Sequence, residues 1–258
     1  MKKGKKIPDE MTFLEHLEDL RKRLFYSFIA LFVGIIPAWF FHKELFNILA
    51  RPVTQYLPEG TKLTFIKLTA PFMLYIKVSF LASLFLSSPF IFYQIWMFIA
   101  PGLYKKEKKY VVPFVLFTTI FFTAGAVFGY FVVFPFACRF FLSMGTEFEP
   151  VITANDYFSL ALRVLLGIAA VFELPTLSFF LSRMGILTAR WMVKNFKYAV
   201  LAVFVIAAII TPTPDWMTQS IIAFPMLALY GLSILIALIF GKRKGKKKKE
   251  NTEDDLAG

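Results

Sequence analysis

The chain has 258 residues, of which 58% are hydrophobic, and its mean hydropathy is +0.65. Soluble domains are about 45–50% apolar, and one small soluble core could not bury 33 phenylalanines, so the composition excludes an ordinary soluble domain. The net charge of +12 is carried by short basic runs between long uncharged stretches, which indicates cytoplasmic loops and lipid headgroups rather than nucleic-acid binding. The single cysteine excludes a disulfide within the chain, and no metal or other cofactor is expected.

Six apolar windows predict an all-α polytopic membrane protein with six transmembrane helices. A span needs about 20 apolar residues, because each residue adds about 1.5 Å against roughly 30 Å of hydrocarbon. In chain order the windows are 24–41, 72–99, 111–135, 159–181, 196–211 and 216–240. The fifth is short and almost adjoins the sixth, which predicts a tight hairpin in a locally thinned bilayer. Proline occurs in several spans, so we expect kinked helices that form a curved wall.

The distribution of lysine and arginine predicts the orientation. The segments 1–23, 100–110, 182–197 and 241–258 hold 7, 4, 4 and 7 basic residues, whereas 42–71, 136–158 and 212–215 hold 4, 1 and 0. The positive-inside rule therefore places both termini in the cytoplasm. We expect three parts, which are a cytoplasmic segment with an amphipathic helix (1–23), the six-helix membrane domain (24–240) and a disordered basic and acidic tail (241–258).

Two segments of the predicted cytoplasmic face carry candidate binding residues. In the N-terminal helix, Glu18 and Asp19 either lie solvated above anionic lipid or bind a cation beside the membrane. In the loop after the second span, Glu107 is the one acid beside four lysines. It either pairs with those lysines, for about 0–1 kcal/mol, or accepts two hydrogen bonds from a partner guanidinium next to the apolar ring of Phe98.

Three further polar residues lie within or at the ends of predicted spans. Glu173 falls inside the fourth span, where a carboxylate costs on the order of 3 kcal/mol, so it should face protein or water. It is either bonded to a neighbouring helix or functional. Thr211 and Gln219 flank the last hairpin, where they serve either internal helix packing or the binding of a partner helix. The sequence holds no pattern typical of a catalytic site.

Five segments, in the right order, resemble the TatC family, the six-span core subunit of the twin-arginine translocase. They are His16-Leu-Glu-Asp-Leu-Arg-Lys-Arg-Leu24, Ser88-Pro-Phe-Ile-Phe-Tyr-Gln-Ile-Trp96, Phe98-Ile-Ala-Pro-Gly-Leu-Tyr-Lys-Lys-Glu107, Tyr130-Phe-Val-Val-Phe-Pro135 and Phe172-Glu-Leu-Pro175. The likeness runs from about residue 11 to residue 240 and leaves out the lysine-rich tail.

The resemblance implies a protein of the bacterial cytoplasmic (inner) membrane that acts as the receptor for twin-arginine signal peptides. Together with small single-span TatA and TatB partners and other copies of itself, such a protein moves folded proteins outward, driven by the proton-motive force. A secondary transporter or channel is the alternative function. It would need polar residues along a path through the bundle, and the spans contain chiefly Glu173.

The resemblance also assigns roles to single residues. It implies that Glu107 and Phe98 form the main site for the paired arginines of the signal peptide. Asp19 stands where many relatives have Glu as a second carboxylate, and its neighbour Glu18 is the alternative for that role. A second group, implied to contact the helices of TatA- or TatB-type partners, comprises Glu173, Thr211 and Gln219.

Overall fold

The structure, a computed structural model, describes residues 13–56, 63–99, 111–145, 147, 151–211 and 215–241. Within these residues every regular element is a helix, apart from one isolated parallel bridge between Thr64 and Thr153. The elements are α1 (Phe13–Phe40), α2 (His42–Thr54), α3 (Ala70–Ile99), α4 (Val111–Phe128), a π-helical segment (Gly129–Val133), α5 (Phe134–Met144), α6 (Ala154–Val171), α7 (Leu174–Arg183), α8 (Ala189–Lys194), α9 (Phe196–Ile210) and α10 (Trp216–Phe240). The expectations for Glu107 and for nearly all of the tail 241–258 fall outside the described residues.

Five helical stretches are long and apolar enough to cross a membrane. They are Leu14–Phe40, Ala70–Ile99, Val112–Met144, Ala154–Arg183 and Trp216–Phe240. The remaining apolar helix, α9, has 15 residues and is about 22 Å long, which is short of roughly 30 Å of hydrocarbon. The structure thus confirms an all-helical membrane architecture and supplies five of the six predicted spans at full length.

Three features differ from the expected element boundaries. Helix α1 is continuous from Phe13, so the N-terminal amphipathic segment and the first span form one helix. The third span does not end at Pro135, because this residue lies in the first turn of α5, where its missing N–H is not needed. The amphipathic helix α2 lies in the segment between the first two spans, for which no helix was predicted.

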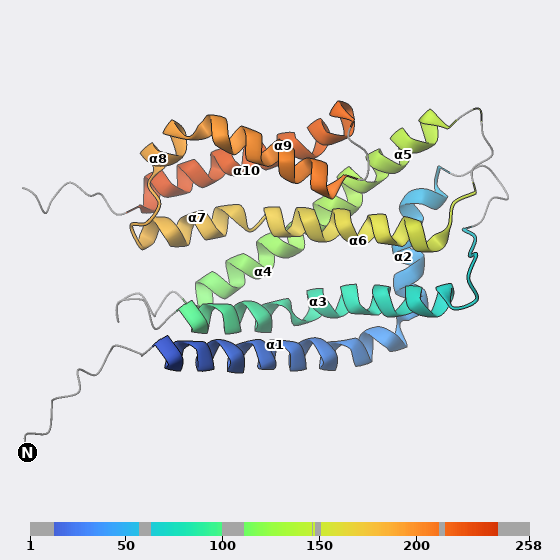
Figure 1. Ribbon diagram of the computed structural model, residues 1–258, viewed down its shortest axis with the longest axis horizontal. Helices are drawn as coiled ribbons and strands as arrows, with labels where there is room; N and C mark the ends of the chain where they lie inside the picture. Colours follow the sequence, from blue (N-terminus) through green and yellow to red (C-terminus); the bar gives the residue numbers. More distant parts are fainter. Residues whose placement is uncertain are drawn as a thin grey trace, which may run out of the picture.

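Helices α1, α3, α6–α7 and α10 run in roughly the same direction, α9 packs on α10, and α4 crosses obliquely and contacts both α3 and α6 (Figure 1). Helix α1 packs chiefly against α3, and the contact is close because Gly34 has no side chain. A Cβ atom at this position would lie 2.7 Å from the hydroxyl oxygens of both Ser83 and Ser87. Ser83 donates a hydrogen bond to the Leu31 carbonyl, so small polar residues hold this pair of helices together.

Two prolines within helices leave carbonyl groups that side chains satisfy. Pro52 in α2 has no N–H for the Ile48 carbonyl, and the hydroxyl of Tyr130 donates to that carbonyl at 2.6 Å. Pro89 in α3 likewise leaves the Phe85 carbonyl free, and the Ser88 hydroxyl donates to it at 2.8 Å. Helices can therefore continue through these prolines without an unpaired polar group in lipid.

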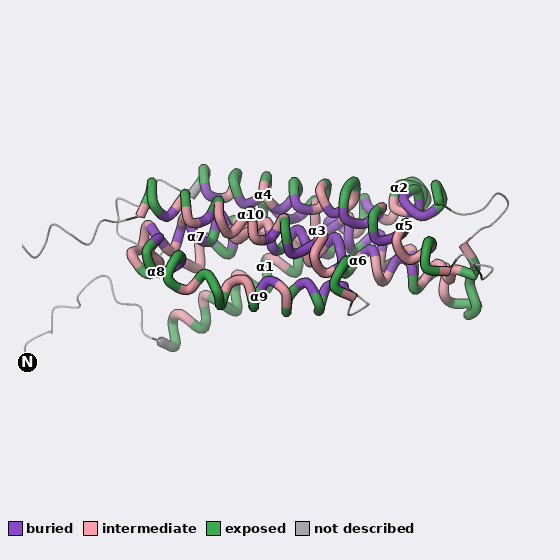
Figure 2. The backbone as a smooth tube through the Cα atoms, turned by 90° about the horizontal axis from the view of Figure 1, so that it is seen from above, coloured by how far each residue is buried: buried purple, intermediate pink, exposed green. Residues whose placement is uncertain are grey.

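The buried residues follow the middle of the helical layer, and exposed residues cover its outer surfaces (Figure 2). Many exposed side chains are large and apolar, as expected for surfaces that face lipid. The start of α1, the end of α3, the start of α4 and the ends of α7 and α10 lie at one end of the layer, which we call the N-terminal end. Helix α2, the end of α5 and the start of α6 lie at the opposite end, called the α2 end.

Candidate functional site

The imidazole ring of His16 stacks on the ring of Phe98 at the N-terminal end. Their centroids lie 4.4 Å apart and their planes are inclined by 21°. His16 is the fourth residue of α1 and Phe98 is the penultimate residue of α3, so the contact joins the beginning of one span to the end of the next. The loop 100–110, which contains Glu107, starts two residues after Phe98, although Glu107 itself lies outside the described residues.

The two candidate carboxylates of the N-terminal segment, Glu18 and Asp19, lie on different faces of α1. Asp19 and Arg23 follow His16 at helical spacings of three and seven residues, and all three side chains are half-buried. The Arg23 guanidinium donates to the Asp19 carboxylate at 2.6 Å. Glu18 is exposed on another face. Asp19 therefore shares the face that contacts Phe98, and Glu18 does not.

Glu173 lies in the two-residue interruption between α6 and α7. Its backbone N–H still donates to Ala170, but Pro175 cannot donate to the carbonyl four residues earlier, and the helix is restarted there. The Oε1 atom of Glu173 is buried and has no hydrogen-bond partner among the described residues. An unpaired buried carboxylate oxygen is costly, so this position holds a polar group that the described part of the chain does not satisfy.

Thr211 follows the last residue of α9, and Gln219 is the fourth residue of α10. Thr211 is buried, and its hydroxyl donates to the Ala207 carbonyl at 2.8 Å. Gln219 is half-buried, and its backbone N–H donates to the Asp215 carbonyl at 3.2 Å. Next to Thr211, Ile210 contacts α6 so closely that a Cβ atom on Gly167 would lie 2.7 Å from it. The hairpin is thus anchored on α6, six residues before Glu173.

The structure therefore brings Asp19 and Phe98 to the same end of the protein and places Glu173, Thr211 and Gln219 elsewhere, along α6–α7 and the last hairpin. Sequence patterns did not indicate His16 as part of the site. The helical spacing of His16 and Asp19 can be read from the sequence. The contact of His16 with Phe98 joins segments that are distant in the sequence, so no local sequence pattern predicts it.

These features define a polytopic α-helical membrane protein in which the carboxylate-bearing start of α1 contacts the end of α3 at one end of the layer of helices. The model of the Sec-independent protein translocase protein (TatC) family matches residues 15–225. The chain belongs to the TatC family. It is therefore a component of a Tat translocase, which is a protein-transport system and not an enzyme family.

Similar proteins cover nearly the whole chain. The TatC protein of Koribacter versatilis is 44% identical over 246 residues, covering 94% of this chain and 91% of the relative. That of Desulforapulum autotrophicum is 42% identical over 247 residues, covering 95% and 91%. A crystal structure of a twin arginine translocase receptor, TatC, has a TM-score of 0.76 and 36% identity, covering 87% of this chain and 98% of that one. A second crystal structure of such a receptor, in DDM, has a TM-score of 0.78.

Proposed function

We propose that this chain is the twin-arginine signal-peptide receptor and the core of a translocase that exports folded proteins across the bacterial cytoplasmic membrane. The proton-motive force drives this export, and single-span TatA- and TatB-type proteins and further copies of the chain take part. The observation that carries the proposal is the His16–Phe98 contact. It holds the carboxylate-bearing start of α1 against the end of α3, from which the loop with Glu107 continues.

Two adjacent arginines require two carboxylates that are close together in an otherwise basic surface. Glu107 binds one guanidinium through two parallel hydrogen bonds, and the ring of Phe98 supplies an apolar wall beside it. Asp19 is the second carboxylate, since it lies on the face of α1 that carries His16. Glu18 serves as the outer, more solvated neighbour. Lysine cannot form the two-pronged contact, so a peptide with paired lysines binds less tightly.

In the membrane the chain crosses six times, with both termini in the cytoplasm. The short helix α9 forms the fifth crossing in a thinned bilayer, and it is supported by the packing of α9 on α10. The N-terminal end then faces the cytoplasm, in keeping with the lysine-rich segments that adjoin it. Labelling of single cysteines tests this topology in a Cys138→Ser background, because Cys138 is the only native cysteine. A cysteine at Glu107 should react only from the inside, and one at Glu147 only from the outside.

Partner helices bind at Glu173 and at the last hairpin. The unpaired Oε1 atom of Glu173 accepts a hydrogen bond from a polar group of a TatA-type helix. Gln219, which is half-buried, contributes a second polar contact, and Thr211 shapes the surface through its bond to Ala207.

Binding of a fluorescent twin-arginine peptide to the purified protein tests the proposed receptor function. Glu107→Ala should weaken binding by at least about 30-fold, because losing one partner of a desolvated charge pair costs about 2–5 kcal/mol. Glu147→Ala removes an exposed acid near the α2 end and is the matched control, with no change expected. Equal affinity of the Glu107→Ala variant and the unmodified protein would refute the assignment.

A further inference from the structure

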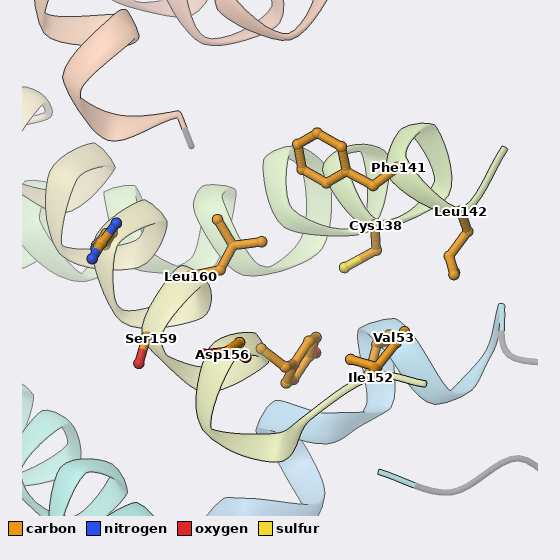
Figure 3. Close-up of a pocket in the computed structure, with 10 residues that line it drawn as sticks. Val53, Cys138, Phe141, Leu142, Ile152, Asp156, Ser159 and Leu160 are labelled. Carbon is orange, nitrogen blue, oxygen red and sulfur yellow. The ribbon is translucent and has the colours of Figure 1, made fainter. Parts of the chain in front are cut away.

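A cavity of about 500 Å³ opens at the α2 end, between α2, α5 and α6 (Figure 3). Its apolar wall includes Val53 from α2, Cys138, Phe141 and Leu142 from α5, and Leu160 from α6. None of these residues belongs to the carboxylate site or to the proposed partner contacts. The cavity is therefore a separate feature of the opposite end of the protein.

Two residues of opposite charge border this cavity, and both belong to α6. Asp156 and Arg163 are separated by seven residues, which is two helical turns, so they lie on the same face about 10 Å apart along the axis. Asp156 lies nearer the start of α6, where its carboxylate accepts a hydrogen bond from the Thr153 hydroxyl at 2.6 Å. The lining thus combines a long apolar surface with two charges. The Asp156 carboxylate is near the start of α6, and the Arg163 guanidinium belongs to a residue two turns further along the helix.

Arg163 lies in an unusual position for a cation without a partner. It follows the start of α6 by nine residues, so its Cα atom lies about 13 Å along a membrane-spanning helix. Its side chain is exposed, and no ion pair or hydrogen bond joins its guanidinium to another described residue. A charged side chain within a span costs about 2.5–3.5 kcal/mol on insertion scales unless an anion or water compensates it. A phosphate group held at the cavity would supply that anion.

We propose that this cavity binds one phospholipid with an ammonium-bearing headgroup, such as phosphatidylethanolamine. One acyl chain lies along the apolar wall, and the phosphate accepts hydrogen bonds from the Arg163 guanidinium, which extends along its stem toward the membrane surface. The ammonium group faces the Asp156 carboxylate. In a bilayer the phosphate of this lipid lies deeper than its ammonium group. Arg163 likewise lies further along the span than Asp156, so the order of the two charges matches this lipid. Phosphatidylglycerol lacks the cation and would place its hydroxyls against Asp156.

Native mass spectrometry of the detergent-purified full chain with added phosphatidylethanolamine or phosphatidylglycerol tests the proposal. The unmodified protein should retain one phosphatidylethanolamine in preference to phosphatidylglycerol. Arg163→Gln should lower its retention at least fivefold, and Asp156→Asn should abolish the preference between the two lipids. Arg139→Gln is the matched control, since Arg139 is an exposed arginine of α5 that does not line the cavity, and it should retain the lipid. Equal retention by the Arg163→Gln and Arg139→Gln variants would overturn the proposal.

Cys138 reports whether the lipid occupies this cavity, because it is the only cysteine and lines the wall. Its reaction with a small thiol reagent should slow when phosphatidylethanolamine is added to the unmodified protein and should not slow for Arg163→Gln. Lipid that binds without slowing this reaction would occupy another site and contradict the proposal. Protection of Cys138 that rises with protein concentration in the absence of lipid would show a second copy in the cavity, which also contradicts it.

Discussion

The rings of His16 and Phe98 stack with a centroid distance of 4.4 Å, and this contact connects the first turns of α1 with the last residues of α3. The two segments are distant in the sequence, and each of them carries part of the proposed receptor site. The contact therefore holds the face of α1 that carries Asp19 next to the end of α3, where Phe98 lies.

Replacing His16 with alanine should weaken binding of a twin-arginine peptide by about 2- to 10-fold. Stacked aromatic pairs contribute about 0.5–1.5 kcal/mol, and the loss of this one allows the start of α1 to move away from α3. The affinity is measured by titration with a fluorescent peptide. His16→Phe preserves the stacking and should restore binding; a His16→Phe variant as weak as His16→Ala would show that the ring contact is not what positions the site.

Arg23 should compete with a guanidinium of the bound peptide for the Asp19 carboxylate. Arg23→Gln releases Asp19 from its 2.6 Å contact and should strengthen peptide binding by up to about fivefold, because such pairs contribute about 0–1 kcal/mol. Asp19→Asn should weaken binding. Glu18→Gln, on the exposed face, should have the smaller effect of the two. A larger loss for Glu18→Gln than for Asp19→Asn would assign the second carboxylate to Glu18.

The hydrogen bond from Tyr130 to the Ile48 carbonyl should depend on Pro52. Tyr130→Phe leaves that carbonyl without a donor and should lower the free energy of unfolding by about 1–3 kcal/mol, as measured in detergent. In a Pro52→Ala background the backbone N–H of residue 52 can satisfy the Ile48 carbonyl, so the same change should cost less. An equal loss in both backgrounds would mean that Tyr130 stabilises the protein through its packing alone.

Replacement of Glu173 with leucine should have opposite effects on the isolated protein and on its assembly. Removal of a buried oxygen without a partner should raise the thermal stability of the purified chain. The same change should reduce the recovery of a TatA-type partner in crosslinking from the α6–α7 interruption. Glu173→Gln keeps a hydrogen-bonding side chain and should retain more of this crosslinking. Unchanged partner recovery with leucine would exclude Glu173 from the contact.

The periodicity and length of the apolar segments predicted most of the helical layer. The window 216–240 coincides with α10, and 72–99 differs from α3 by two residues at its start. Helix α2 was not predicted because its charged residues and Pro52 are typical of a connecting segment, and the helix is supported by tertiary contacts such as Tyr157 to the Leu49 carbonyl. The π-helical segment Gly129–Val133 has no local sequence signal of comparable strength.

The residue types of the candidate site were predictable, whereas their arrangement was not. Glu107 is conspicuous in the sequence because it is the one acid among four lysines, and Glu173 is conspicuous because a carboxylate within a membrane span is costly. The choice between Glu18 and Asp19 depends on which face of α1 contacts α3, and a helix that faces lipid on most sides gives little amphipathic pattern from which to predict that face. The stacking of His16 on Phe98 supplied this information.

Site-specific photocrosslinking from position 98 tests the central claim most directly. A photoreactive phenylalanine analogue at Phe98 should crosslink to a precursor with paired arginines in its signal peptide and not to one with paired lysines. Glu107→Ala should remove this crosslink while leaving the amount of membrane-inserted protein unchanged. A crosslink that persists with paired lysines, or in the Glu107→Ala variant, would contradict a carboxylate site for two guanidinium groups at this end of the protein.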